Sequence, residues 1–378
     1  MAVTLAELLA QPEVAAALAA GDTPFFILEP AAAVEAYRQL EAALPGVVHH
    51  YAVKSNSHPA LVGALARAGA RFDVATTAEI DLALAAGATP ERIIHTHPHV
   101  KPRDIGAALD RGVRTFVADS DAQIRKLAAF RVPELAVLAR VSYPNEGARL
   151  NLSLKFGLAP EEMPGFLDYA RDHEVPVRGL SYHVGSQNTD PAVFAGSLRA
   201  TGELLAAGIA AGHRLDVIDI GGGFPVRYVG GEPQLEEFAA AIRPVLAELP
   251  GVEFWSEPGR FVSAGAMHLV TSVVAETYRP ALEQHWVYID DGLFGGYSNV
   301  LTDHVAPQLL AVGIPAGRER VAQTIAGPTC DSTDVVARGV DLPRLVVGDI
   351  LVSPLMGAYT LVTATTFNGI PITPVITV

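Results

Sequence analysis

Residues 47–74 read VVHHYAVKSNSHPALVGALARAGARFDV and contain the repeating unit from which the fold of this chain is predicted. The β-branched and aromatic run at 47–53 predicts a strand, and a second short strand is predicted at 71–74. Between them, the Ala- and Leu-rich segment 59–69 has the apolar spacing of an amphipathic helix. A strand, a helix and a further strand therefore follow one another directly.

The same alternation continues through the first two-thirds of the chain. Apolar runs predict eight strands, at residues 47–53, 71–74, 92–97, 115–119, 134–141, 177–184, 215–220 and 252–257. Segments of helical period lie between them, at residues 59–69, 77–87, 101–111, 122–130, 160–173, 191–212 and 233–249. An open doubly wound sheet would show the same alternation, but eight units favour closure. We therefore expect an α/β fold with a TIM-type (β/α)8 barrel.

A different pattern flanks the predicted barrel. After Arg260, long helical segments are few and strand-like runs occur at residues 268–276, 286–291, 349–353 and 371–378. Before the barrel, residues 4–20 predict a helix broken near Pro12, and residues 23–29 predict an extra strand. The predicted organisation is an N-terminal helix and strand (1–29) packing on the β domain, the barrel (30–260) and a mostly β C-terminal domain (261–378).

Composition and charge exclude several classes of protein. Half of the 378 residues are hydrophobic and 18% are charged, which favours a large buried core. The net charge of −14 argues against a nucleic-acid partner, because such binding needs clustered Lys and Arg. The single cysteine, Cys330, cannot form an intrachain disulfide, and no apolar run reaches the roughly 18 residues of a membrane span. We therefore expect a cytoplasmic protein without a membrane partner.

Chemically distinctive residues follow the predicted barrel strands, at the end where barrel enzymes carry their active sites. Taken in strand order, they are Lys54, Asp73, Arg140, His183, Ser186, the triplet Gly221, Gly222 and Gly223, then Glu257, Gly259 and Arg260. Each feature by itself is common in loops. Their joint occurrence at strand ends predicts an active site at this rim of the barrel.

This set of residues suits pyridoxal 5′-phosphate. A lysine amine such as Lys54 can form a Schiff base with the cofactor. The glycine triplet lets backbone N–H groups approach a phosphate closely, and Arg260 adds a cationic fork. A carboxylate at Glu257 would keep the pyridine nitrogen protonated, which makes the ring a stronger electron sink. His183 would then lie flat against the ring.

Longer motifs carry a family resemblance. They are YAVKSN (51–56), FDVATTAEI (72–80), KFG (155–157), HVGS (183–186), GGGFP (221–225), EPGR (257–260), GPTCDSTD (327–334), MGAYT (356–360) and FNG (367–369). In this order they resemble the ornithine decarboxylase family, one of the fold-type III pyridoxal-phosphate decarboxylases with an alanine-racemase-like barrel. The motifs extend over most of the chain, and their combination is far more specific than any one of them.

The resemblance implies roles for individual residues. The catalytic residues would be Lys54, His183, Glu257 and Cys330, with Lys54 bound covalently to the cofactor and Glu257 at the pyridine nitrogen. Asp73 and Arg140 would surround the cofactor, and Glu79 would lie further out. The implied phosphate ligands are Ser186, Gly222, Gly223, Gly259, Arg260 and Tyr359. No metal is implied.

The resemblance also implies a substrate and a dimer. Asp303 would meet the distal amine of a basic amino acid, with Asp331 and Phe367 also at the substrate. Cys330 and Asp331 would be supplied by the partner subunit of a homodimer with shared active sites. The implied reaction is decarboxylation of L-ornithine to putrescine, in polyamine biosynthesis, with L-lysine to cadaverine as a second reaction. Thr302 stands where the family usually has Tyr, which leaves the ranking of ornithine, lysine and arginine open.

Other functions remain as alternatives. An arginine decarboxylase or a meso-diaminopimelate decarboxylase of the same fold is the nearest; the latter needs cations, for which Arg318 and Arg320 are the candidates. A racemase is disfavoured, because it would carry Arg in place of Glu257. An inactive cofactor-binding regulator is the alternative from another class. The run His95, His97 and His99 invites a metal interpretation through alternation on one strand face, but Pro98 interrupts it, so we interpret these histidines as structural.

Overall fold

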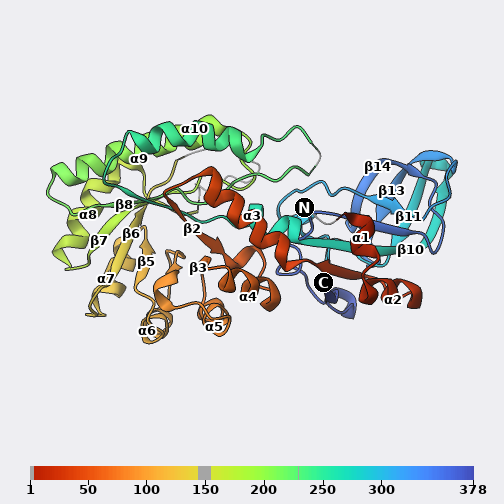
Figure 1. Cartoon of the computed structure of the whole chain (residues 1–378), viewed down its shortest axis with the longest axis horizontal. Helices are drawn as coiled ribbons and strands as arrows, with labels where there is room; N and C mark the ends of the chain where they lie inside the picture. Colours follow the sequence, from red (N-terminus) through yellow and green to blue (C-terminus); the bar gives the residue numbers. More distant parts are fainter. Residues whose placement is uncertain (1–3, 144–154, 229) are drawn as a thin grey trace. The chain divides into compact units, whose positions relative to one another are not determined.

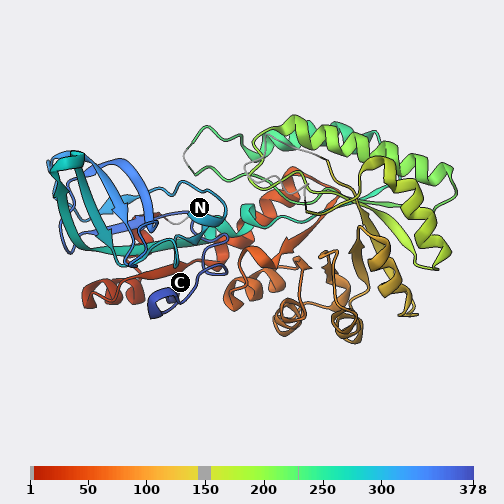
Figure 2. The same cartoon turned by 180° about the vertical axis from the view of Figure 1, so that it is seen from behind.

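The computed structural model describes residues 4–143, 155–228 and 230–378. The chain forms two compact units, which are described separately below. The barrel unit comprises residues 34–143, 155–227 and 231–262, and the β unit comprises residues 4–33, 228, 230 and 263–378. Figure 1 labels the elements of both units, and Figure 2 shows them from behind.

Eight parallel strands form a closed barrel in the barrel unit. They are β2 (Val47–Ala52), β3 (Arg71–Val74), β4 (Ile93–His95), β5 (Thr115–Ala118), β6 (Ala136–Arg140), β7 (Val177–Ser181), β8 (Val217–Asp219) and β9 (Glu253–Ser256). Each strand pairs with the next, and β9 pairs with β2, so the predicted barrel is confirmed. Most strands are shorter than predicted, because the chain leaves the ladder early to form the rim loops.

Helices surround the barrel strands in sequence order (Figure 1). They are α3 (Pro30–Ala43), α4 (Pro59–Arg67), α5 (Thr77–Ala85), α6 (Pro102–Asp110), α7 (Asp121–Ala128), α8 (Met163–Asp172), α9 (Pro191–Ala210) and α10 (Leu235–Ala247). Prolines at the start of α4, α6 and α9 occupy positions that need no N–H donor. Gly87, Gly112 and Gly212 follow α5, α6 and α9 with φ of 96°, 85° and 92°, which confirms the predicted helix stops.

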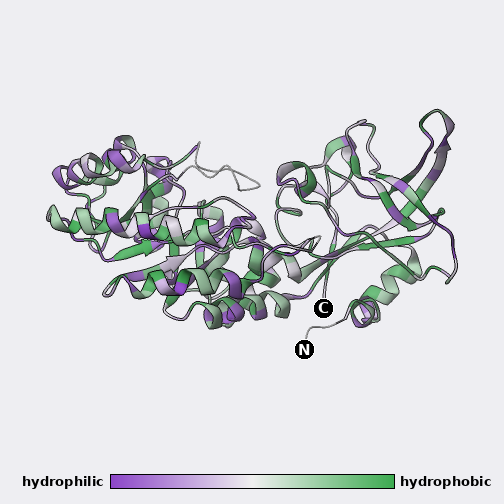
Figure 3. Cartoon of the chain, turned by 90° about the horizontal axis from the view of Figure 1, so that it is seen from above, coloured by the Kyte–Doolittle hydropathy of each residue, from purple (hydrophilic) through white to green (hydrophobic). Residues whose placement is uncertain are grey.

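The barrel interior is apolar. Ile94, Val117, Leu138, Val217 and Trp255 form one buried cluster, and each comes from a different strand. Figure 3 shows hydrophobic strands and helices with mixed faces, as expected for helices that bury one side against a sheet. In the described part of the chain, no helix is long and apolar enough to cross a membrane.

The β unit is built on one sheet. Its strands are β1 (Phe25–Leu28), β10 (Met267–Arg279), β11 (Gln284–Ile289), β12 (Leu310–Val312), β13 (Arg320–Ala326), β14 (Val335–Pro343), β15 (Ile350–Ser353) and β16 (Val375–Thr377). The order is β12-β15-β10-β11-β13-β14, and β1 pairs with β10 and β16. The mostly β second domain is therefore confirmed. The predicted run 371–378 is strand only at Val375–Thr377, because the preceding residues lie outside the ladder.

The N-terminal segment packs within the β unit. The helical segment predicted to break near Pro12 is present as two short helices, α1 (Leu5–Leu9) and α2 (Pro12–Ala20). Leu8 and Val14 share a buried cluster with Phe25 and Ile27 of β1 and with Val270 of β10. Strands β13 and β14 were not predicted, because their exposed faces carry polar and charged residues that weaken the alternation signal.

A buried histidine makes the stability of the barrel pH-dependent. Burial, with a smaller contribution from repulsion by Arg71 and His49, lowers the pKa of His50 from 6.5 to about 3. Below pH 6.5 the unfolded chain therefore takes up a proton that the folded chain refuses until about pH 3, so stability is lost as the pH falls through this window. Between pH 7.5 and 5 this one group costs about 2 kcal/mol of the free energy of unfolding.

We therefore expect the His50→Gln variant to lose about 2 kcal/mol less stability than the parent between pH 7.5 and 5. The free energies of unfolding in urea at the two pH values measure this difference. A His304→Asn variant, altered at an exposed histidine, serves as the control and should follow the parent. Equal losses in parent and His50→Gln would contradict the assignment.

Candidate active site

The barrel topology brings the predicted residues of this unit to one rim. Lys54 lies in the short helix Val53–Ser55 after β2, Asp73 lies in β3, and Arg140 is the last residue of β6. His183 and Ser186 follow β7, the glycine triplet follows β8, and Glu257, Gly259 and Arg260 follow β9. Because all eight strands are parallel, their carboxyl ends meet at the same end of the barrel.

Lys54 is paired with a buried carboxylate. Its Nζ lies 3.1 Å from Oδ2 of Asp73, whose side chain is 1% exposed, whereas that of Lys54 is 43% exposed. The other oxygen of Asp73 accepts a hydrogen bond from the hydroxyl of Thr96. Glu79, on α5, accepts a hydrogen bond from the backbone N–H of Ala75 at 2.6 Å, and burial raises the pKa of Glu79. The Lys54 amine is thus oriented while remaining accessible.

His183 is held as a neutral ring. Its Nδ1 accepts a hydrogen bond from the backbone N–H of Gly185 at 3.0 Å, so the neutral imidazole carries its proton on Nε2. Burial, together with the positive charges of Arg140 and Lys54, lowers the pKa of His183 to about 3. A neutral ring can lie against a cofactor without adding a charge.

The glycine triplet forms a close-packed cradle. A Cβ atom on Gly222 would lie 2.5 Å from the backbone oxygen of Glu257 and 3.3 Å from Nε2 of His183. Gly223 has a φ of 104°, and its Cβ would lie 2.3 Å from the oxygen of Gly185. Only glycine therefore fits here. Beside this loop, Nη2 of Arg260 donates to the hydroxyl of Ser186 at 3.2 Å, which adds a cation and a hydroxyl suited to an anion.

Two buried carboxyl groups share the rim. Burial raises the pKa of Glu257, and the neighbouring charges of Asp219 and Asp73 raise it further, while Lys54 and Arg140 act in the opposite direction. Burial likewise raises the pKa of Asp219, whose Oδ1 accepts the N–H of Gly221 at 2.8 Å. A protonated pyridine ring would place a positive charge beside Glu257 and so reduce the repulsion between the carboxylates of Glu257, Asp219 and Asp73. The site therefore fits pyridoxal phosphate.

Asp219 was not among the predicted site residues. The signal was present in the sequence, because this carboxylate is the last but one residue of the predicted strand 215–220, two positions before the glycine triplet. Its complete burial and its effect on the pKa of Glu257 are visible only in the folded unit.

The remaining predicted residues lie in the β unit. Cys330 is exposed, and its backbone N–H donates to Oδ1 of Asn368 at 3.1 Å. The neighbouring Phe367 packs its ring against Phe294, with 4.5 Å between ring centroids. The fold of the β unit thus brings the segments of Cys330 and Phe367 together.

Three further predicted residues of the β unit lie in turns. Asp331 accepts hydrogen bonds from the backbone N–H and the hydroxyl of Thr333, at 2.8 and 2.7 Å, and these bonds lower its pKa. Asp303 follows the short helix α12 (Ser298–Thr302), and Tyr359 has a φ of 54°. Their side chains belong to loops whose shape is set within the β unit.

The residues behind two alternative interpretations have structural partners. Arg318 pairs with Asp349, and Nε of Arg320 lies 2.9 Å from Oδ2 of Asp341. Strand β4 ends at His95, before Pro98, so His97 and His99 do not continue one strand face with it. His95 stacks on Phe116, and His99 pairs with Asp119 at 3.2 Å. Within the described residues no group of three potential metal ligands occurs.

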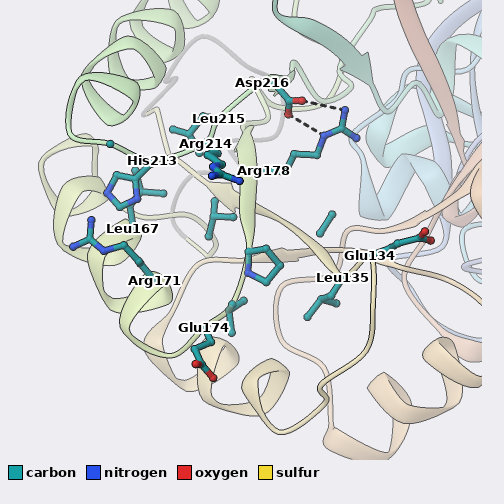
Figure 4. Close-up of a pocket in the computed structure, with 15 residues that line it drawn as sticks. Glu134, Leu135, Leu167, Arg171, Glu174, Arg178, His213, Arg214, Leu215 and Asp216 are labelled. Carbon is teal, nitrogen blue, oxygen red and sulfur yellow. Dashed lines mark hydrogen bonds and ion pairs between the residues drawn. The ribbon is translucent and has the colours of Figure 1, made fainter.

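A cavity of about 880 Å³ lies at the opposite end of the barrel, where β6, β7 and β8 begin (Figure 4). Charged residues around it pair with each other: Arg178 contacts Asp216 at 2.9 Å and Glu253 at 2.6 Å. The amino-terminal ends of barrel strands are typical of stability rather than catalysis. We therefore place the candidate site at the other rim, where Lys54, His183 and Glu257 follow the barrel strands.

Comparisons with known proteins agree with this site. Residues 31–264 match the family described as pyridoxal-dependent decarboxylase, pyridoxal binding domain. A chloroplastic ornithine decarboxylase of Nicotiana glauca is 33% identical over 94% of this chain and 83% of its own length. The lysine/ornithine decarboxylase of Vibrio vulnificus, solved in complex with putrescine, is 34% identical, with a TM-score of 0.90 over 100% of this chain and 99% of that one. An arginine decarboxylase of Paramecium bursaria Chlorella virus, bound to agmatine, is 28% identical, with a TM-score of 0.90 over 97% and 99% of the two chains.

Proposed function

Because this chain belongs to the pyridoxal-dependent decarboxylase family, we propose that it converts L-ornithine to putrescine and CO₂ in polyamine biosynthesis, with L-lysine as a slower substrate. It is a carboxy-lyase for basic amino acids that uses pyridoxal 5′-phosphate. The observation that carries the proposal is the rim at which Lys54, His183 and Glu257 meet the glycine cradle and Arg260. In this proposal, residues 30–260 bind the cofactor and residues 261–378 supply further residues of the site. Residues 1–29 pack on the latter region.

Each residue of the rim has a proposed task. Lys54 would hold the cofactor through Nζ, Glu257 would keep the pyridine nitrogen protonated, and the neutral His183 would pack on the ring. The phosphate is bound by Ser186, Gly222, Gly223, Gly259, Arg260 and Tyr359, while Asp73 and Arg140 set the charge around the site. The bound cofactor supplies the electron sink that makes loss of CO₂ feasible.

Cys330 is the proposed acid. When the carboxylate leaves as CO₂, the carbon that carried it must gain a proton for the amine product to form. A thiol can donate that proton, and the Cys330 thiol is exposed on its loop.

The negative charges of the proposed substrate-binding residues favour a basic substrate over a dicarboxylic one. Asp303 and Asp331 are the proposed partners of the distal ammonium, and two carboxylates would repel a second carboxylate on the substrate. Arg318 and Arg320, the candidate cations for meso-diaminopimelate, are already paired with Asp349 and Asp341. Arginine is the second candidate, because a guanidinium also pairs with carboxylates and one structural relative is an arginine decarboxylase. A CO₂-release panel with ornithine, lysine, arginine and meso-diaminopimelate tests the ranking; no release from any of them would favour the inactive regulator.

We expect Asp303→Asn to lower kcat/KM for ornithine about ten- to a hundred-fold. A charge-assisted hydrogen bond to an ammonium contributes roughly 1.5–3 kcal/mol, and the neutral amide loses most of this. For L-norvaline, which has the same carbon chain without the distal amine, kcat/KM should be the same in Asp303→Asn and the parent. Asp341→Asn, altered at an exposed ion pair on β14, is the control. Equal losses on ornithine and norvaline would show that Asp303 does not recognise the amine.

We further propose a cytoplasmic homodimer with shared active sites, in which Cys330 and Asp331 complete the site of the partner subunit. The single cysteine supports the compartment, since one thiol forms no intrachain disulfide. The shared sites predict complementation between two strongly impaired chains, Lys54→Ala and Cys330→Ala. After subunit exchange at equal amounts, about a quarter of parental activity should return, because half of the dimers are mixed and each has one intact site. Lack of recovery after verified exchange would rule out sharing.

A further inference from the structure

The loop between β13 and β14 carries the single cysteine of the chain, and the buried carboxylate of Asp334 fixes this loop through hydrogen bonds. Asp334 is 2% exposed. Its Oδ1 accepts the backbone N–H of Leu293 at 2.7 Å, and its Oδ2 accepts the N–H and the hydroxyl of Thr329, at 3.1 and 2.7 Å. Thr329 directly precedes Cys330. One side chain therefore ties the residue before the cysteine to a segment that lies 41 positions away from Asp334 in the sequence.

Two glycines make room for this carboxylate. A Cβ atom on Gly292 would lie 2.3 Å from Oδ1 of Asp334, and one on Gly327 would lie 2.4 Å from the same oxygen. Such separations are far below van der Waals contact, so any larger residue would displace the carboxylate. The backbone N–H of Gly327 also donates to the carbonyl oxygen of Asp334 at 2.9 Å, which closes the loop at its base.

A second side chain holds the loop at Cys330 itself. Oδ1 of Asn368 accepts the backbone N–H of Cys330 at 3.1 Å. Asn368 has φ 57° and ψ 13°, a left-handed conformation that asparagine tolerates better than most residues. The adjoining Phe367 packs on Phe294, which follows Leu293, the residue bound to Asp334. Two segments of the β unit, residues 292–294 and 367–368, thus converge on the cysteine loop.

We propose that Asp334 and Asn368 are positioning residues that fix the location of the Cys330 thiol for proton donation. Asp334 contacts the backbone N–H and the hydroxyl of Thr329, and Asn368 contacts the backbone N–H of Cys330, so both act on the reaction through Cys330. This inference rests on the proposed role of Cys330 as the acid. Asp334 fixes the position of Thr329, the residue before the cysteine, and Asn368 fixes the orientation of the peptide N–H of Cys330.

The sharpest variant is Asn368→Gly. Glycine adopts a positive φ without strain, so this change removes the hydrogen bond to Cys330 while the backbone keeps its path. In the holoenzyme we expect kcat for ornithine to fall about tenfold with KM unchanged, because one hydrogen bond to the loop is lost. The same substitution in a Cys330→Ala background should lower kcat no further, since the residue being positioned is absent. Glu283→Gly, which also replaces a left-handed residue of the β unit (φ 50°), is the matched control.

Asp334→Asn tests the other contact. The amide can still accept the N–H of Leu293 through its oxygen, but its NH₂ group would then face the N–H of Thr329, so two donors oppose each other. The expected result is a kcat loss of about tenfold or more that again disappears in the Cys330→Ala background. Asp341→Asn on β14 is the control for the change of Asp to Asn.

A spectroscopic readout separates loop order from activity. A nitroxide attached to Cys330, the only thiol of the chain, reports the motion of this loop in its electron paramagnetic resonance spectrum. We expect narrower lines in Asn368→Gly and Asp334→Asn than in the parent or the controls, with melting temperatures close to that of the parent for Asn368→Gly. Unchanged line widths, or equal kcat losses with and without Cys330, would overturn the inference. A Cys330→Ala variant with parental kcat would instead show that Cys330 is not the acid. In that case the line widths would still test whether Asp334 and Asn368 order the loop.

Discussion

Replacing Lys54 with alanine is expected to lower kcat by at least about 10³-fold, because the variant loses its covalent link to the cofactor. Lys54→Arg should be equally inactive. Arginine keeps a positive charge near Asp73, which Lys54 contacts at 3.1 Å, but its guanidinium cannot form the link. The pair of variants therefore separates the covalent role of Lys54 from its ion pair. Lys101→Ala, altered at an exposed lysine before α6, should retain parental activity.

A chemical readout accompanies the kinetics of Lys54. Borohydride reduction of the holoenzyme followed by proteolysis should leave the cofactor on the peptide that contains Lys54. Attachment to a peptide containing Lys155, the other lysine of a family motif, would overturn the assignment. Loss of kcat in Lys54→Ala but not in Lys54→Arg would show that only the positive charge matters.

Glu257→Gln is expected to lower kcat about 10²- to 10³-fold, the scale on which removal of one preorganised electrostatic group acts. The amide carries no negative charge, so the pyridine nitrogen loses the partner that keeps it protonated and the ring becomes a weaker electron sink. Glu257→Asp, which restores the charge on a shorter side chain, should recover part of the loss. Measured kcat values for ornithine decide between these outcomes.

The matched control for Glu257 lies on β9, the strand that directly precedes it. Glu253, at the opposite end of β9, pairs with Arg178 at 2.6 Å and accepts the indole N–H of Trp255 at 2.8 Å. Glu253→Gln should keep kcat within a few-fold of the parent, since this end of the barrel is remote from the site. A similar kcat loss in both variants would mean that Glu257 acts through the stability of the barrel and not at the cofactor.

Local sequence pattern was sufficient to predict the barrel. Its strands and helices alternate with distinct periods, and the helix stops at Gly87, Gly112 and Gly212 need a positive φ, which is a local requirement. Helix α3 was missed although its buried positions Ala33, Tyr37 and Leu40 do show helical spacing. Strands β13 and β14 were missed because their stability depends on pairing, of β13 with both β11 and β14, which a local pattern does not contain.

By itself, the sequence determined the inventory of the site: a lysine, a histidine, a glycine triplet, a carboxylate and an arginine, each directly after a strand of a repeating unit. This followed because a strand end is a local feature and parallel strands present equivalent ends. The tertiary structure decided which of these groups are charged and what holds them. Burial raises the pKa of Glu257 and lowers that of His183, and burial is contributed by residues from all parts of the barrel unit. Asp219 joins the site, and Asp334 and Asn368 reach the loop of Cys330, through contacts between distant segments that only folding brings together.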